Sequence, residues 1–149
     1  MLNWFYRWCD GVRHRRRLRS GNQAHAMGRR GEDLAHRHLQ TLGYVVVARN
    51  YRTPSGSAEI DLVAWDRDIL VFVEVKTRAT DEFGSPDRAV DQRKRRHILQ
   101  AADDYQHRAV TQTTKTRFDV VSVVLREGEP ELTGHTPDAF HPDGDNSQL

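Results

Sequence analysis

Residues 58–78, AEIDLVAWDRDILVFVEVKTR, are the part of this chain that most restricts its fold. Two runs rich in Ile, Leu, Val and Phe flank a polar break at 66–68. This pattern predicts two antiparallel strands joined by a tight turn. If the turn centres on residues 67 and 68, Asp61 lies opposite Glu74, and Lys76 follows on the same face as Glu74.

The opposed carboxylates of Asp61 and Glu74 suggest a metal site. Directly opposed residues have Cβ atoms about 4.5–5.5 Å apart. Two carboxylates at about that distance repel by roughly 4 kcal/mol at an effective dielectric of about 20. A divalent cation would reverse this cost, because Mg²⁺ prefers one or two carboxylates together with water and phosphate oxygens. Lys76 beside the cation would orient or deprotonate an attacking water, so the hairpin predicts metal-assisted phosphodiester hydrolysis.

A purely structural interpretation of the hairpin is also available. Glu74 and Lys76 would then lie on an exposed sheet face, with Lys76 paired to Glu59 across the hairpin. Such pairs are common and contribute about 0.2–1 kcal/mol. However, the run 69–75 is apolar on both faces, which is typical of a central strand covered on both sides. A carboxylate and a lysine on such a strand favour the functional interpretation.

Beyond the hairpin, the chain resembles a known group of proteins. An acidic residue on one strand followed by Glu-x-Lys on the next is the signature of the PD-(D/E)xK nuclease superfamily, and Asp61, Glu74 and Lys76 match it. A longer ordered series resembles the YraN-like family, a bacterial family without an assigned function. Its blocks here are GRRGE (28–32), EIDL (59–62), VFVEVKTR (71–78), FGSP (83–86), Lys94 and RFDVV (117–121). The resemblance extends from about residue 24 to residue 125.

The resemblance implies an α/β fold with a restriction-endonuclease-like αβββαβ core, in which helices flank a mixed central sheet, similar to archaeal Holliday-junction resolvases. It implies Mg²⁺ or Mn²⁺ held by Asp61, Glu74 and the backbone carbonyl of Val75, with Lys76 at the attacking water. Glu32, carried over from the GRRGE block, would complete the metal shell or position water. A resolvase-like role would need two sites and hence a homodimer.

The net charge of +2 hides a steep gradient along the chain. Residues 1–30 carry eight arginines against one acid, whereas residues 127–149 carry six acids and no lysine or arginine. The basic arm, which includes Arg15, Arg16 and Arg17, is able to neutralise phosphates without reading sequence. It could equally be a solvated tail. The aromatic residues at 4–8 add the alternative of contact with an anionic membrane surface.

Further sequence features bound the domain organisation. We expect a basic arm over 1–23, a nuclease-like domain over 24–126 and a disordered acidic tail over 127–149. No apolar stretch approaches the ~20 residues that span a bilayer, which predicts no integral membrane association. The single cysteine, Cys9, excludes an internal disulfide, so a cytoplasmic location is expected.

A helix expected over about 87–107 carries the remaining candidate contacts with nucleic acid. Lys94 falls on its apolar stripe, where either its alkyl stem lies along the core edge or its ammonium faces substrate phosphate. Its neighbours Arg93, Arg95 and Arg96 are expected to form a solvated or phosphate-contacting face. Arg78, at the end of the VFVEVKTR block, is a further candidate contact with nucleic acid.

The sequence therefore predicts a nuclease that acts on nucleic acid, with DNA as the expected substrate and branched DNA as the form suggested by the resolvase likeness. The competing class is a non-catalytic module that binds nucleic acid or a protein partner on the same fold.

Overall fold

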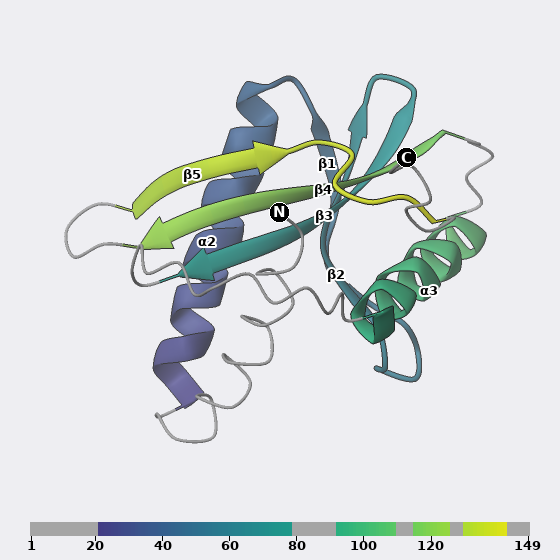
Figure 1. Cartoon of the computed structure of the whole chain (residues 1–149), viewed down its shortest axis with the longest axis horizontal. Coiled ribbons are helices and arrows are strands. Elements are labelled where there is room, and N and C mark those ends of the chain that lie inside the picture. The colour runs from purple at the N-terminus through teal and green to yellow at the C-terminus, as the bar shows by residue number, and fades with distance from the viewer. Residues whose placement is uncertain (1–20, 79–91, 110–114, 126–129, 143–149) are drawn as a thin grey trace, which may run out of the picture.

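The computed structural model describes residues 21–78, 92–109, 115–125 and 130–142 (Figure 1). Within these ranges the elements follow in the order α2 (Gly21–Thr41), β1 (Val45–Arg52), β2 (Glu59–Asp66), β3 (Ile69–Arg78), α3 (Gln92–Arg108), β4 (Thr116–Leu125) and β5 (Pro130–Thr136). The predicted αβββαβ order is confirmed, and a further strand follows it.

The five strands form one mixed sheet in the order β1-β2-β3-β4-β5. Neighbouring strands are antiparallel except for β3 and β4, which run parallel and are connected through α3. In the described part of the chain no helix is long and apolar enough to cross a membrane.

The central strand β3 is covered on both faces, as its continuous apolar run predicts. Leu70 and Phe72 belong to a buried cluster that includes Ile98 of α3. Val71 and Val73, which alternate with them, belong to a second cluster with Leu39 of α2. The two helices therefore pack on opposite faces of the sheet, and β3 contributes to both cores.

The predicted register of the β2–β3 hairpin is confirmed from the turn as far as Leu62↔Val73, but the predicted pairing of Asp61 with Glu74 is not formed. The two strands pair from Leu62↔Val73 to Asp66↔Ile69, and Arg67 in the turn has a positive φ of 56°. Beyond Leu62↔Val73 the strands part: β2 continues alongside β1, and β3 continues alongside β4 (Figure 1). The opening begins one residue before Asp61 and Glu74 would have faced each other.

The prediction of disorder after residue 126 was wrong for residues 130–136, which form strand β5. This strand pairs antiparallel with β4 from Val120↔Thr136 to Leu125↔Pro130, so the sheet extends past the predicted end of the domain. Its proline and glycine weaken a strand pattern in the sequence, but an edge strand tolerates both. The basic arm with Arg15, Arg16 and Arg17, the FGSP block and the end of the acidic tail lie outside the described residues.

Candidate functional site

Asp61 lies at the point where β2 and β3 part. Its Oδ2 accepts a hydrogen bond from the backbone N–H of Val75 at 2.7 Å. In a continuous antiparallel ladder that N–H would face the β2 backbone, so the side chain of Asp61 takes the place of a main-chain partner. This bond fixes the carboxylate in the opening and leaves it further lone pairs for other ligands.

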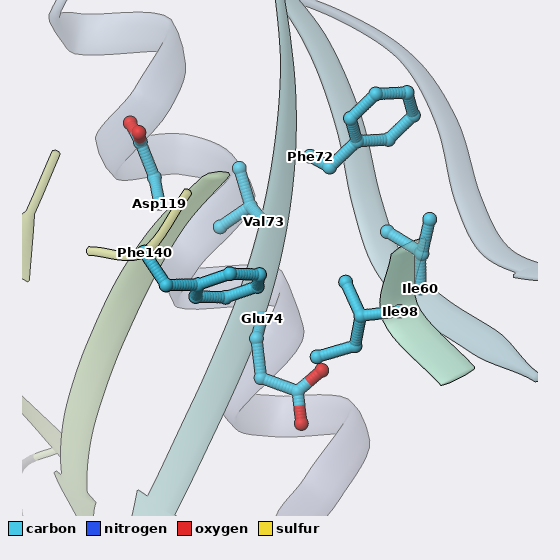
Figure 2. Close-up of a pocket in the computed structure, with 7 residues that line it drawn as sticks. All are labelled: Ile60, Phe72, Val73, Glu74, Ile98, Asp119 and Phe140. Atoms are coloured by element: carbon cyan, nitrogen blue, oxygen red, sulfur yellow. The ribbon is translucent and has the colours of Figure 1, made fainter. Parts of the chain in front are cut away.

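Glu74 lies on β3, two residues after Phe72 and on the same side of the strand. Only 9% of its surface is exposed. Figure 2 shows it projecting into a small pocket that is otherwise mainly apolar, with Ile98 from α3 and Phe140 from the C-terminal segment among the lining residues. A carboxylate is an unusual lining residue for such a pocket, because a buried charge is unfavourable unless it is paired or hydrogen-bonded.

Lys76 follows on the same side of β3 and has 0% of its surface exposed. A solvated position on an open sheet face is therefore excluded for this lysine. Burial of an ammonium is unfavourable unless it is paired, so this position is not explained by packing alone.

Glu32 is brought to the sheet by a close approach of α2 to β3. A Cβ atom at Gly31 would lie 1.8 Å from Thr77 Oγ1, so only glycine lets the helix backbone come this near. The neighbouring Glu32 accepts a hydrogen bond from Asn50 Nδ2 at 3.0 Å, and Arg49 lies 3.8 Å away. Asn50 lies on β1 beside Asp61, since its two neighbours pair with the two neighbours of Asp61.

These contacts hold Glu32 against β1, one strand away from the opening. Among the described residues no three acidic, histidine or cysteine side chains come together as a metal-binding group. Membership of Glu32 in the metal shell is therefore not seen in this arrangement, and its alternative role, the positioning of water, stays a prediction. The remaining donors are two carboxylates, Asp61 and Glu74, and the carbonyl of Val75. This set of hard oxygen donors fits Mg²⁺ or Mn²⁺, which keep several water ligands, and does not fit zinc.

The basic residues predicted to contact nucleic acid are only partly visible. The side chains of Arg78 and Lys94 lie outside what the structure describes. Arg93 and Arg96 are exposed on α3, as expected. Arg95 differs from the expectation of a solvated face: it is partly buried, and its guanidinium lies over the ring of Phe140, 5.5 Å from the ring centroid.

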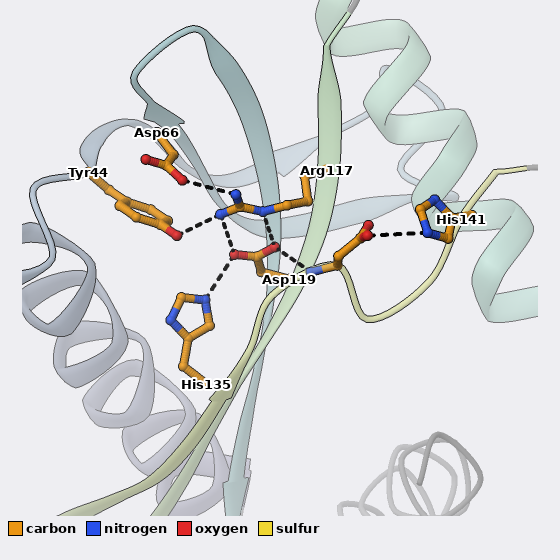
Figure 3. Close-up of polar contacts among 7 residues, drawn as sticks. Tyr44, Asp66, Arg117, Asp119, His135 and His141 are labelled. Atoms are coloured by element: carbon orange, nitrogen blue, oxygen red, sulfur yellow. Dashed lines mark hydrogen bonds and ion pairs between the residues drawn. The ribbon is translucent and has the colours of Figure 1, made fainter.

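A second polar cluster, which was not predicted from the sequence, is centred on Asp119 of β4 (Figure 3). Asp119 is 1% exposed, and Arg117 donates two hydrogen bonds to it, from Nε at 2.8 Å and from Nη2 at 3.0 Å. His135 Nε2 lies 2.9 Å from Asp119 Oδ2, and the backbone N–H of Asp138 donates to Oδ1 at 3.0 Å. Arg117 also donates to Asp66 at 2.9 Å and to the hydroxyl of Tyr44 at 2.6 Å.

The electrostatics of this cluster favour full ionisation of its central pair. Burial alone would raise the pKa of Asp119, but hydrogen bonds from His135, Arg117 and the Asp138 backbone outweigh it and lower the pKa. The hydrogen bonds to Asp119 chiefly raise the pKa of Arg117. A local signal existed in the sequence: Arg117 and Asp119 alternate within an apolar strand, which puts two charges on one covered face.

The profile of a family described as "Uncharacterised protein family UPF0102" matches residues 31–123. The matched segment contains Glu32, Asp61, Glu74, Lys76 and Asp119, and it ends before His135 and Phe140.

Individual relatives extend the similarity over most of the chain. A UPF0102 protein of Solibacter usitatus is 50% identical over 126 residues, which cover 85% of this chain and 91% of that protein. A UPF0102 protein of Koribacter versatilis is 45% identical over 106 residues, 71% of this chain and 73% of the relative. A third, from Desulfosudis oleivorans, is 44% identical over 118 residues, 79% of this chain and 94% of its own length.

Proposed function

This chain belongs to the uncharacterised protein family UPF0102, and from that premise we propose that it is a metal-dependent nuclease that hydrolyses phosphodiester bonds in nucleic acid. The substrate that we propose is DNA in branched form, because the Asp61, Glu74 and Lys76 pattern resembles that of PD-(D/E)xK nucleases and of archaeal junction resolvases. Two sites would be needed to cut both strands of a junction, so the acting form is proposed to be a homodimer.

One observation carries the proposal. The carboxylate of Asp61 replaces a main-chain partner where β2 and β3 part, and Glu74 and the fully buried Lys76 lie on the strand that forms the other side of this opening. Strands that only had to be stable would continue their ladder and bury apolar side chains at these positions. Charged groups that interrupt a ladder are expected at functional sites, where stability is given up for binding or chemistry.

Each residue has a distinct role in the proposed reaction. Asp61, Glu74 and the Val75 carbonyl would hold Mg²⁺ or Mn²⁺, which supplies Lewis-acid activation of the phosphate and of water when bound. The Val75 N–H keeps the Asp61 carboxylate in one orientation before substrate arrives. The Lys76 ammonium orients the attacking water and stabilises the negative charge that develops on the phosphate. Glu32, held by Asn50, positions water at the edge of the site.

The test is cleavage of a panel of linear, flapped and four-way-junction DNA and of single-stranded RNA, each with Mg²⁺ and with Mn²⁺. We expect cleavage by the wild type, with the four-way junction cut fastest. Asp61→Asn should abolish cleavage, because it removes a charged oxygen and keeps the shape of the side chain. Asp103→Asn is the matched control: the same change at an exposed carboxylate of α3 should leave cleavage unchanged.

The competing proposal is a non-catalytic module that binds nucleic acid. Binding of the same substrates by the wild type, without cleavage of any of them by either metal, would replace the nuclease proposal with that one.

A further inference from the structure

The chain at and after β5 is held against β4 by one side-chain contact from β5 itself and by two backbone contacts from the segment that follows it. His135 and the backbone N–H of Asp138 both bond to Asp119, and the N–H of Ala139 donates to the carbonyl of Phe118 at 2.7 Å. Asp138 has a positive φ of 55°, which turns the chain back toward the sheet. These contacts fix the position of the next residue, Phe140.

Phe140 is the last of three stacked aromatic rings that lie side by side across neighbouring strands of the sheet. Its ring stacks on Phe118 of β4 at 4.8 Å, with an angle of 22° between the planes. Phe118 stacks on Phe72 of β3 at 5.5 Å. Phe140 is 4% exposed and lines the same pocket as Glu74 (Figure 2). The C-terminal segment therefore forms one wall of the candidate site.

Arg95 of α3 lies against the end of this stack of rings. Its guanidinium is 5.5 Å from the centroid of the Phe140 ring, a cation–π geometry. Arg95 precedes Ile98, another residue of the pocket wall, by three positions, so the two share a face of α3. The side chain is partly exposed, so nucleic acid is able to reach it from solvent.

The surroundings of Arg95 do not explain a positive charge at this place. Its Nε is buried and makes no hydrogen bond to any residue that the structure describes. Of the two carboxylates that line the pocket, Asp119 is already paired with Arg117, and the structure, which describes both residues, shows no salt bridge between Arg95 and Glu74. Packing against Phe140 would be served equally by an apolar side chain, without the cost of a buried donor. The charge is therefore best explained by an anion that arrives from outside.

We propose that Arg95, held in place by Phe140, contacts a backbone phosphate of the nucleic acid that enters the site at Glu74. The C-terminal segment is then part of the substrate-binding surface, and Phe140 is a positioning residue that acts through Arg95. This inference rests on the proposed nuclease function. It adds to the site a C-terminal segment that lies outside the residues matched by the family. It also assigns to Arg95 a role that the exposed Arg93 and Arg96 do not share.

The experiment measures binding and cleavage of a four-way junction by Arg95→Gln. We expect KM and the dissociation constant to rise about tenfold, as for loss of one charge-assisted hydrogen bond, with kcat changed less than threefold. The slope of log affinity against log salt should fall by about 0.9. Arg108→Gln is the matched control: it removes one charge from the same helix, at a residue already paired with Asp104, and should change neither value.

Phe140→Leu tests the positioning role. It keeps an apolar side chain but removes the ring face, so it should raise KM in the same direction as Arg95→Gln, and the double variant should show little additional effect. An unchanged KM and salt slope in Arg95→Gln would overturn the inference even if Phe140→Leu fails to fold. If the wild type neither cleaves nor binds the junction, the proposed function itself fails, which is a different result.

Discussion

Two carboxylates lie one register position apart on neighbouring strands of this sheet and have opposite surroundings. Asp119 of β4 pairs with Val73, and Glu74 is the next residue along β3. Asp119 is enclosed by a guanidinium, an imidazole and a backbone N–H, all within hydrogen-bond distance. Glu74 lines a mainly apolar pocket. The first charge is therefore used within the fold, whereas we propose that the second, with Asp61 and Lys76, serves a reaction.

The largest expected effect follows removal of the charge from Asp119. Asp119→Asn leaves the half-buried Arg117 without the main acceptor of its charge, and loss of one partner of a buried pair typically costs about 3–5 kcal/mol. The free energy of unfolding, measured by urea denaturation with an unchanged m value, should fall by about that amount.

Glu74→Gln is the matched change on β3, and it should cost less stability than Asp119→Asn, because a mainly apolar pocket disfavours a charge. If both variants lose the same stability, the two carboxylates do not differ in the way the comparison claims.

The next effect concerns Lys76 and is on rate. Lys76→Met fills the buried space of the alkyl stem and removes the charge, so the variant should keep a cooperative fold. Preorganised charges beside the reacting group typically contribute a factor of about 10²–10³, so kcat on the junction should fall by that factor. Binding of the junction, measured by fluorescence anisotropy, should stay within about threefold. A variant with normal turnover would remove Lys76 from the chemistry.

A third effect concerns metal binding, which we expect at Asp61 and Glu74 and not at the Asp119 cluster. At a concentration of Mg²⁺ or Mn²⁺ about 100 times the dissociation constant, binding should stabilise the wild type by about 2.7 kcal/mol, seen as a higher melting temperature. Asp61→Asn/Glu74→Gln should lose this response, and Asp103→Asn should keep it. Equal responses in all three proteins would place the metal elsewhere.

The smallest expected effect is a pH dependence of the free energy of unfolding, caused by His38, a neighbour of His135 in the Asp119 cluster. Burial, and secondarily the neighbouring His135, lowers the pKa of His38 below its ordinary value of about 6.5. The unfolded chain therefore binds more protons in that window, so stability is present above about pH 6.5 and falls as the pH drops toward the folded pKa. The slope of unfolding free energy between about pH 5 and 7 should be smaller in His38→Gln.

His107→Gln, at an exposed histidine of α3, is the control for this slope and should behave as the wild type. An unchanged slope in His38→Gln would assign the pH dependence to other groups.

The sequence pattern predicted those features that depend on residues close together in the chain. Alternation of apolar residues around a two-residue turn gave the register of the hairpin, and the continuous apolar run indicated the covered strand that buries Lys76. The parting of β2 and β3 was not predictable, because it depends on each strand following a different neighbour.

The Asp119 cluster and β5 depend on contacts between residues far apart in the sequence. Tyr44, Asp66 and His135 meet Arg117 and Asp119 from three other segments, and no spacing rule connects them. The Gly, Pro and acidic residues of the C-terminal segment predicted disorder. Composition alone does not reveal that this segment forms hydrogen bonds with the buried carboxylate of Asp119.

The contact between Gly31 and Thr77 has a consequence for how this sequence is able to change over generations. Replacing Thr77 by alanine would remove its Oγ1 and its Cγ2, yet the Cβ of residue 77 would still lie 3.0 Å from any Cβ at position 31. A contact of 3.0 Å is still very tight, so an alanine at position 77 would relieve the clash only in part. Residue 31 is therefore able to acquire a side chain only if residue 77 first becomes smaller and the helix or the strand then shifts. Change at position 31 depends on change at position 77 for as long as this helix and this strand remain in contact.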